Sequence, residues 1–135
     1  MSLSATHRLA TPPPAGWERD LWLFHVAGFI VMHDVRRRTQ VELSEEISSV
    51  EQRVAERAID ATIANFLTIA DQVIGRMEND EFAVSLRLAV QLEDQSSGET
   101  LQHLDLFESD GACGPLNDWI NGDFGTHPVA HTRPG

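Results

Sequence analysis

Residues 82–92 alternate strictly between apolar side chains and small or polar ones. The apolar positions are Phe82, Val84, Leu86, Leu88, Val90 and Leu92. A period of two is typical of a half-buried β-strand. A turn-forming cluster that contains Gly98 follows, and the alternation then resumes. We therefore predict a β-hairpin with strands over about 82–94 and 99–108. The alternative is a pair of helices, with Ser97 as the cap of the second.

Residues 44–78 have the spacing of an amphipathic helix. One stripe comprises Ile47, Val50, Val54, Ala58 and Ala61, and it continues in Ile59, Ile63, Phe66, Ala70, Val73 or Ile74, and Met77. Ser44 is the expected N-cap, with Glu45 and Glu46 in the first turn, where the helix dipole favours negative charge. The pattern predicts one continuous helix lying across an apolar sheet.

The length of this predicted helix bears on assembly. A straight helix over 44–78 is about 50 Å long at about 1.5 Å per residue. A compact domain of 135 residues is only about 37 Å across. We therefore expect the helix to kink or its end to be covered by a second subunit.

The apolar segment Leu21–Met32 must be buried, but its secondary structure is ambiguous. Apolar residues from Trp17 to Val35 recur at helical spacing, and acids precede them while arginines follow, as suits a helix dipole. The aromatic and β-branched composition, with Gly28 inside it, favours a strand instead. We favour a helix over residues 18–35 and retain the strand as the alternative.

The remaining segments complete an α+β interpretation. Residues 1–16, with three consecutive prolines, and residues 125–135 are predicted to be extended arms. A short helical turn is expected at 116–120. The predicted fold is a single domain over 17–124, in which one long amphipathic helix packs on a small antiparallel sheet that contains the hairpin.

The charge is strongly acidic, with 21 Asp and Glu residues against 10 basic ones, all of them Arg. Residues 79–123 hold ten of the acids and a single Arg, a net charge of −9. Such a surface repels phosphate groups, so direct binding to nucleic acid or to an anionic membrane is not expected. The longest apolar run has 12 residues, whereas a membrane helix needs about 20.

The single cysteine, Cys113, excludes an intrachain disulfide and fits a reducing compartment. We therefore expect the protein to be cytoplasmic or to lie within an assembled particle. Its acidic surroundings would raise the pKa of the Cys113 thiol, which argues against catalysis there. The sequence contains no phosphate-binding glycine loop, dinucleotide fingerprint or zinc-ribbon spacing, so no cofactor is expected.

The histidines offer weak candidates for chemistry. His127 and His131 have helical metal-pair spacing, but Pro128 lies between them, so no metal site is predicted. His25 and His33 lie in the apolar segment, where a histidine oriented by Asp34 would resemble a catalytic base. We expect ordinary buried or exposed histidines, and we assign no catalytic residue.

Partner-binding residues are predicted from charge. The basic cluster Arg36, Arg37 and Arg38 either pairs with acids of its own chain, such as Glu42, or grips an acidic patch on a second copy. The candidate acidic residues are Asp105, Glu108 and Asp110. The sequence therefore favours a non-catalytic protein that binds itself or another protein, most simply as a homo-oligomer or as part of a larger assembly. A small acidic inhibitor of a basic protein, and an enzyme or ligand carrier that uses buried histidine, are the alternatives.

Overall fold

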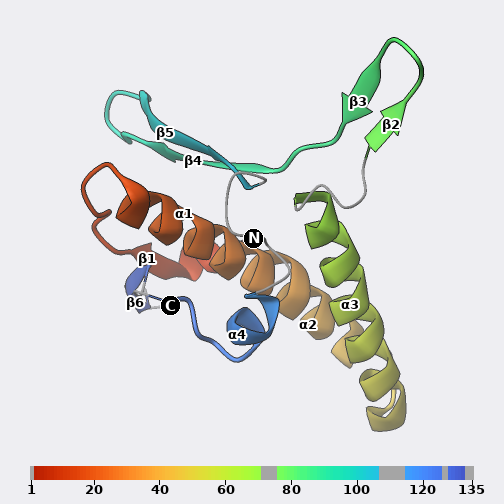
Figure 1. Ribbon diagram of the computed structural model, residues 1–135. Coiled ribbons are helices and arrows are strands. Elements are labelled where there is room, and N and C mark those ends of the chain that lie inside the picture. Colours follow the sequence, from red (N-terminus) through yellow and green to blue (C-terminus); the bar gives the residue numbers. More distant parts are fainter. Residues whose placement is uncertain (1, 71–75, 107–114, 126–127, 133–135) are drawn as a thin grey trace.

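The computed structural model describes residues 2–70, 76–106, 115–125 and 128–132. Its longest element is a continuous helix of 28 residues. It comprises α1 (Trp17–Ile30), a π-helical segment η2 (Val31–Arg37) and α2 (Arg38–Ser44). The predicted helix over 18–35 is thus confirmed. The chain is α+β, as predicted, with this helix beside small antiparallel hairpins (Figure 1).

Glycine inside α1 is explained by a close contact rather than by a strand. A Cβ at Gly28 would overlap the indole ring of Trp119, which lies on the short helix α4 (Leu116–Ile120). The helix therefore accepts the poor propensity of Gly28 to let an aromatic ring approach its backbone. The helical turn predicted at 116–120 is confirmed as α4.

The predicted hairpin is present as β4 (Ala89–Glu93) and β5 (Thr100–Asp105). The strands are antiparallel, with Val90 opposite Leu104 and a register shift near Glu93. Leu92 and Leu104 are buried, and the hairpin packs against α1 (Figure 1). The two-helix alternative for this region is wrong.

The first part of the predicted strand belongs to a different hairpin. Residues 83–85 form β3 (Ala83–Ser85), which pairs antiparallel with β2 (Arg76–Glu78). The alternation over 82–92 therefore runs through two sheets with a break between them. Alternation reports which way side chains face, and it does not say which strand is the neighbour.

The predicted continuous helix over 44–78 is wrong at both ends. The observed helix is α3 (Ser49–Ala70), and residues 76–78 form a strand. Ser44 ends α2, and its hydroxyl donates to the Val41 carbonyl. The cap is Ser48, whose Oγ accepts the Glu51 N–H and donates to the Glu51 carboxylate. A helix of 22 residues is about 33 Å long, so the argument from a rod that outgrows its own domain does not hold.

The packing of α3 also differs from expectation. It contacts α2 and η2 and contributes Ile63 and Leu67 to the buried core, whereas the sheet β4–β5 packs against α1. The long helix on the sheet is therefore the segment 17–44, which contains the most apolar run of the sequence. The more evenly amphipathic α3 lies on its other end (Figure 1).

The two predicted arms pair with each other. After a 3₁₀ turn, η1 (Ser4–Thr6), the strand β1 (His7–Leu9) pairs antiparallel with β6 (Val129–Thr132). This small sheet and α4 lie on the side of α1 opposite β4–β5 (Figure 1). Because α1 is covered from two sides, three consecutive residues, Trp22, Leu23 and Phe24, are buried.

The core formed in this way is a single cluster. It comprises Trp22, Leu23, Phe24, Met32, Ile63, Leu67, Leu92, Leu104, Leu106, Leu116, Trp119 and Phe124. Most of these residues come from α1, β4–β5 and the segment around α4. Neither β2 nor β3 contributes a residue to it. Within the described ranges, no helix is long and apolar enough to cross a membrane.

Candidate interaction surfaces

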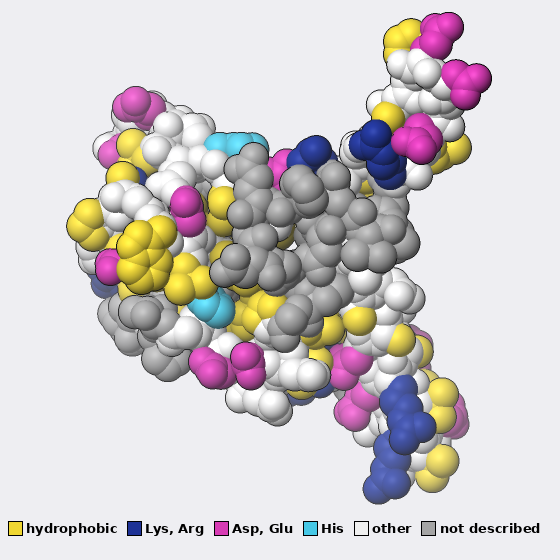
Figure 2. All heavy atoms as spheres, viewed as in Figure 1, with side chains coloured by type: hydrophobic (Ala, Val, Ile, Leu, Met, Phe, Trp, Pro, Cys, Tyr) yellow, Lys and Arg dark blue, Asp and Glu magenta, His cyan; other side chains and the backbone are white. Residues whose placement is uncertain are grey.

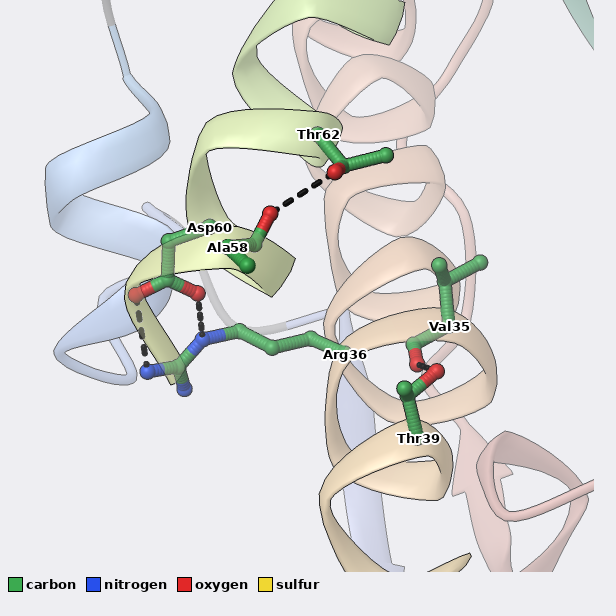
Figure 3. A network of polar contacts seen from close by, with 6 residues as sticks. All are labelled: Val35, Arg36, Thr39, Ala58, Asp60 and Thr62. Atoms are coloured by element: carbon green, nitrogen blue, oxygen red, sulfur yellow. Dashed lines mark hydrogen bonds and ion pairs between the residues drawn. The ribbon is translucent and has the colours of Figure 1, made fainter. Parts of the chain in front are cut away.

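The first of the predicted partner-binding arginines is engaged inside the chain. Arg36 Nε donates to Asp60 Oδ1 at 2.7 Å and Arg36 Nη2 to Asp60 Oδ2 at 3.4 Å, so the pair is bidentate (Figure 3). Both side chains are about one quarter to one third exposed, at 22% and 32%. The pair therefore links η2 to α3.

The other charged candidates are partly engaged as well. Arg38 donates to Glu42 one turn later, as the intrachain interpretation of the basic cluster expected, and Arg37 is exposed. Asp105 accepts a bond from Arg87 at 3.0 Å. Glu108 and Asp110 lie outside the described residues. The structure thus gives Arg36, Arg38 and Asp105 intrachain roles, and their part in partner binding remains a prediction.

Asp34 does not orient His33. The carboxylate of Asp34 accepts bonds from the Ser4 N–H and from the hydroxyls of Ser2 and Ser4. Burial disfavours the charge of this group, but these hydrogen bonds outweigh it and lower the pKa of Asp34. Asp34 therefore anchors the N-terminal arm to η2.

His33 is held by its own helix. The ring stacks on Phe29 with centroids 3.9 Å apart, and His33 Nδ1 lies 2.8 Å from the Phe29 carbonyl oxygen. A neighbouring ring, His7, makes an edge contact with both. The histidine that resembled a candidate base is thus satisfied by a backbone group.

His25 is held by an indole rather than by a carboxylate. Trp119 Nε1 donates to His25 Nδ1 at 3.0 Å. Because indole is only a donor, His25 Nδ1 must accept, so the ring is the neutral tautomer with its proton on Nε2. Burial lowers the pKa of His25, although Asp123 and Asp118 act in the opposite direction. The interaction locks α4 onto α1 and leaves this nitrogen unable to act as a base.

The groove beside His25 offers little for small-molecule chemistry. It has a volume of about 300 Å³ and is lined by Pro13, Trp17, Glu18, Leu21, Trp22 and His25. Its titratable side chains are Glu18 and the partly engaged His25. Among the described residues, no three His, Cys, Asp or Glu side chains are grouped to hold a metal ion. Cys113 and His127 lie outside these residues, and His103 is exposed on β5.

The hairpin β2–β3 carries an exposed apolar face. Met77 lies opposite Val84, and opposite residues of an antiparallel pair share a face. By strand alternation Phe82 and Leu86 lie on the same face as Val84. Met77, Phe82 and Val84 are 79%, 69% and 71% exposed. Figure 2 shows this hairpin projecting from the body at the upper right, with hydrophobic and acidic side chains together at its end.

The turn of this hairpin is well formed and acidic. The Asn79 N–H donates to the Phe82 carbonyl at 2.9 Å, and Asn79 Oδ1 accepts the N–H groups of Glu81 and Phe82. This is a local turn stabilised by an asparagine side chain. The two central residues, Asp80 and Glu81, are exposed, and neither forms an ion pair with a described residue.

The second exposed apolar face lies on α3. The less exposed apolar residues Ile59, Ile63 and Leu67 lie on one side of α3. The opposite side presents Val50, Val54, Ala58 and Ala61. Val50 and Val54 are 76% and 68% exposed. We call this set the open face of α3. Its end projects from the body at the lower right of Figure 2.

Two arginines border the open face. Arg53 and Arg57 are one helical turn apart and exposed. Neither forms an ion pair with any described residue. The hairpin and the open face therefore each combine exposed apolar side chains with charged side chains that form no ion pair within the described ranges, and these charges are of opposite sign.

The sequence pattern predicts buried positions for both sets of residues. The stripe of Val50, Val54, Ala58 and Ala61 was expected to cover a sheet, and Met77 was expected to end the same helix. Two local signals contradict a continuous helix. Ser48 and Glu51 have capping-box spacing, and the polar run 78–81 between Met77 and Phe82 is a turn signal.

Comparisons with known proteins provide no independent guide to function. No family model, curated protein or solved structure matches the chain.

Proposed function

We propose that the protein works by self-association, as a homo-oligomer or an assembly component, and that the apolar face of hairpin β2–β3 is its main contact. The observation that carries this proposal is the exposure of Met77, Phe82 and Val84 on an element that projects from the body.

An isolated two-stranded hairpin is marginal in water unless its apolar face is covered. Exposed contiguous apolar side chains on an ordered projection are typical of protein interaction sites. The other face carries Arg76, Glu78 and Ser85, which interact with one another through Arg76. One side of the hairpin is therefore suited to water and the other to a protein surface.

The test is the solution mass of the purified chain as a function of concentration, measured by light scattering. We expect a mass that exceeds the 15.0 kDa of one chain and that falls on dilution. The double substitution Phe82→Asp with Val84→Asp should give a monomer, because two carboxylates cannot be buried unpaired in an apolar interface.

The matched control is Ser85→Asp, which adds a negative charge to the same strand on its other face, beside Arg76. This variant should associate like the wild type. Far-ultraviolet circular dichroism should show that all three proteins are folded. A wild-type chain that stays monomeric at every concentration would reject the proposal, and an acidic protein that binds a different partner would then be the better interpretation.

A further inference from the structure

We infer that the hairpin β2–β3 of one copy docks on the open face of α3 of another copy. The inference rests on the proposed self-association and specifies its two surfaces. Each copy then offers a donor, the hairpin, and an acceptor, the helix. Such a contact joins different patches and is heterologous.

The apolar side chains of the two surfaces have matching spacing. Val50 and Val54 are four residues apart on a helix, which is about 6 Å along the axis. Phe82 and Val84 are two residues apart on a strand, which is about 6.8 Å. A strand laid along α3 therefore places Phe82 and Val84 in register with the two valines.

The charges are complementary at the same places. Asp80 and Glu81 come immediately before Phe82, and Arg53 and Arg57 border Val50 and Val54. Within the part of the chain that the structure describes, none of these four side chains forms an ion pair. Docking in one direction along α3 brings the acidic turn beside the arginines, which sets the orientation of the contact.

The same packing already exists inside one subunit. Hairpin β4–β5 covers α1 with Leu92 and Leu104, and Gln102 of β5 donates a hydrogen bond to Asp20 of α1. The proposed contact repeats this arrangement between copies. In the structure β2–β3 follows the C-terminal end of α3, whereas Val50 and Val54 lie near its N-terminal end, and both faces are exposed (Figure 1).

The first experiment mixes two variants, each of which has one broken surface. Val84→Glu removes the hairpin contact and Val54→Glu removes the helix contact, so each protein alone should be a monomer. Their mixture should form a 1:1 dimer of twice the chain mass, because the intact hairpin of the Val54→Glu copy docks on the intact helix of the Val84→Glu copy. Light scattering of tagged and untagged proteins measures both mass and composition.

The second experiment reverses charges. Arg53→Glu with Arg57→Glu should weaken association at least tenfold, and adding Asp80→Arg with Glu81→Arg to the same chain should restore it. The control is Gln95→Glu, which adds a negative charge at an exposed position in the turn between β4 and β5 and should leave the association constant unchanged.

The outcomes separate this inference from the proposed function. If the wild type associates and Val84→Glu is monomeric but Val54→Glu associates normally, self-association through the hairpin stands and its docking on α3 is rejected. If both variants are monomeric and their mixture is too, the two surfaces do not pair with each other. Restored association in the mixture and in the charge reversal would establish the contact.

Discussion

Hairpins β4–β5 and β2–β3 share an alternating apolar pattern, but their apolar side chains have opposite environments. In β4–β5 the apolar side chains Leu92 and Leu104 are buried against α1, whereas in β2–β3 Met77 and Val84 are almost fully open to solvent. Both hairpins have apolar residues at every second position of at least one strand. Apolar alternation therefore shows that a face must be covered, and it does not show whether the covering surface belongs to the same chain.

The acidic residues in the turns of these hairpins also differ in how far they are engaged by the protein itself. Asp94 closes the β4–β5 turn through bonds from Ser96 and Ser97, and Gly98 has a positive φ of +74°. In the Asp80-Glu81 turn the corresponding bonds go to Asn79, and neither carboxylate forms an ion pair with a residue that the structure describes. In β4–β5 the acidic turn residue Asp94 accepts hydrogen bonds from the backbone, whereas in β2–β3 the turn residues Asp80 and Glu81 are exposed.

The largest expected effect separates the buried face from the exposed one. Leu104→Ala should lower the free energy of unfolding by about 2–5 kcal/mol, because it removes buried methyl groups and leaves a cavity. Val84→Ala in the dilute monomer should change it by less than about 0.5 kcal/mol. Urea unfolding of both variants measures the difference, and equal effects would contradict the contrast drawn here.

A second substitution tests the close packing of Trp119 against α1, the helix that covers hairpin β4–β5. Gly28→Ala should destabilise the fold by about 1–3 kcal/mol, because a Cβ there overlaps the Trp119 ring. Helix propensity alone predicts the opposite, a gain of about 1 kcal/mol. Thermal unfolding followed by tryptophan fluorescence decides between the two, and a more stable variant would mean that Trp119 does not pack as described.

A smaller effect is expected where α3, which carries the exposed hairpin, joins the body. Arg36→Ala should cost about 1 kcal/mol, because it leaves the partly buried Asp60 without its bidentate partner. Arg38→Ala removes an exposed pair within one helix and should cost less than about 0.5 kcal/mol. Denaturant unfolding of the two variants provides the measurement, and indistinguishable values would assign Arg36 no special role.

The pH dependence of the free energy of unfolding should report the burial of His25, which lies on α1 in contact with α4. The pKa of His25 lies below 6.5 in the folded protein, so the neutral ring contributes its full stability above that value. As the pH falls below 6.5, the unfolded chain binds the proton first and stability is lost down through the lowered folded pKa. Urea midpoints at about pH 8 and about pH 5 should therefore differ more for the wild type than for His25→Gln.

The control for this measurement is a comparison of the same two proteins at more acidic pH, where aspartates titrate. Hydrogen bonds hold the pKa values of Asp34 and Asp94 below 3.8, so their contributions are present above that value and are lost as the pH falls further. Both proteins should lose that stability equally. The same pH dependence of stability for wild type and His25→Gln between the two higher pH values would show that burial does not lower the pKa of His25 in the folded protein.

Several features could be predicted from local sequence because they depend on local physics. The β4–β5 hairpin follows from alternation and a Gly-containing turn, and α4 follows from a short apolar turn between glycines. Spacing and charge order favour the helix over 18–35, although its composition suggests a strand. The α+β class followed from these elements together.

The partners of each face were decided only by the tertiary structure. The residues around Gly28 do not predict its contact with Trp119, and those around Arg36 do not predict its pairing with Asp60, because each contact joins residues far apart along the chain. For the same reason the sequence could not show that the Val50 and Val54 stripe stays exposed while the Ile63 and Leu67 stripe is buried. Periodicity determines that a face is apolar, but which apolar faces meet depends on how the whole chain packs.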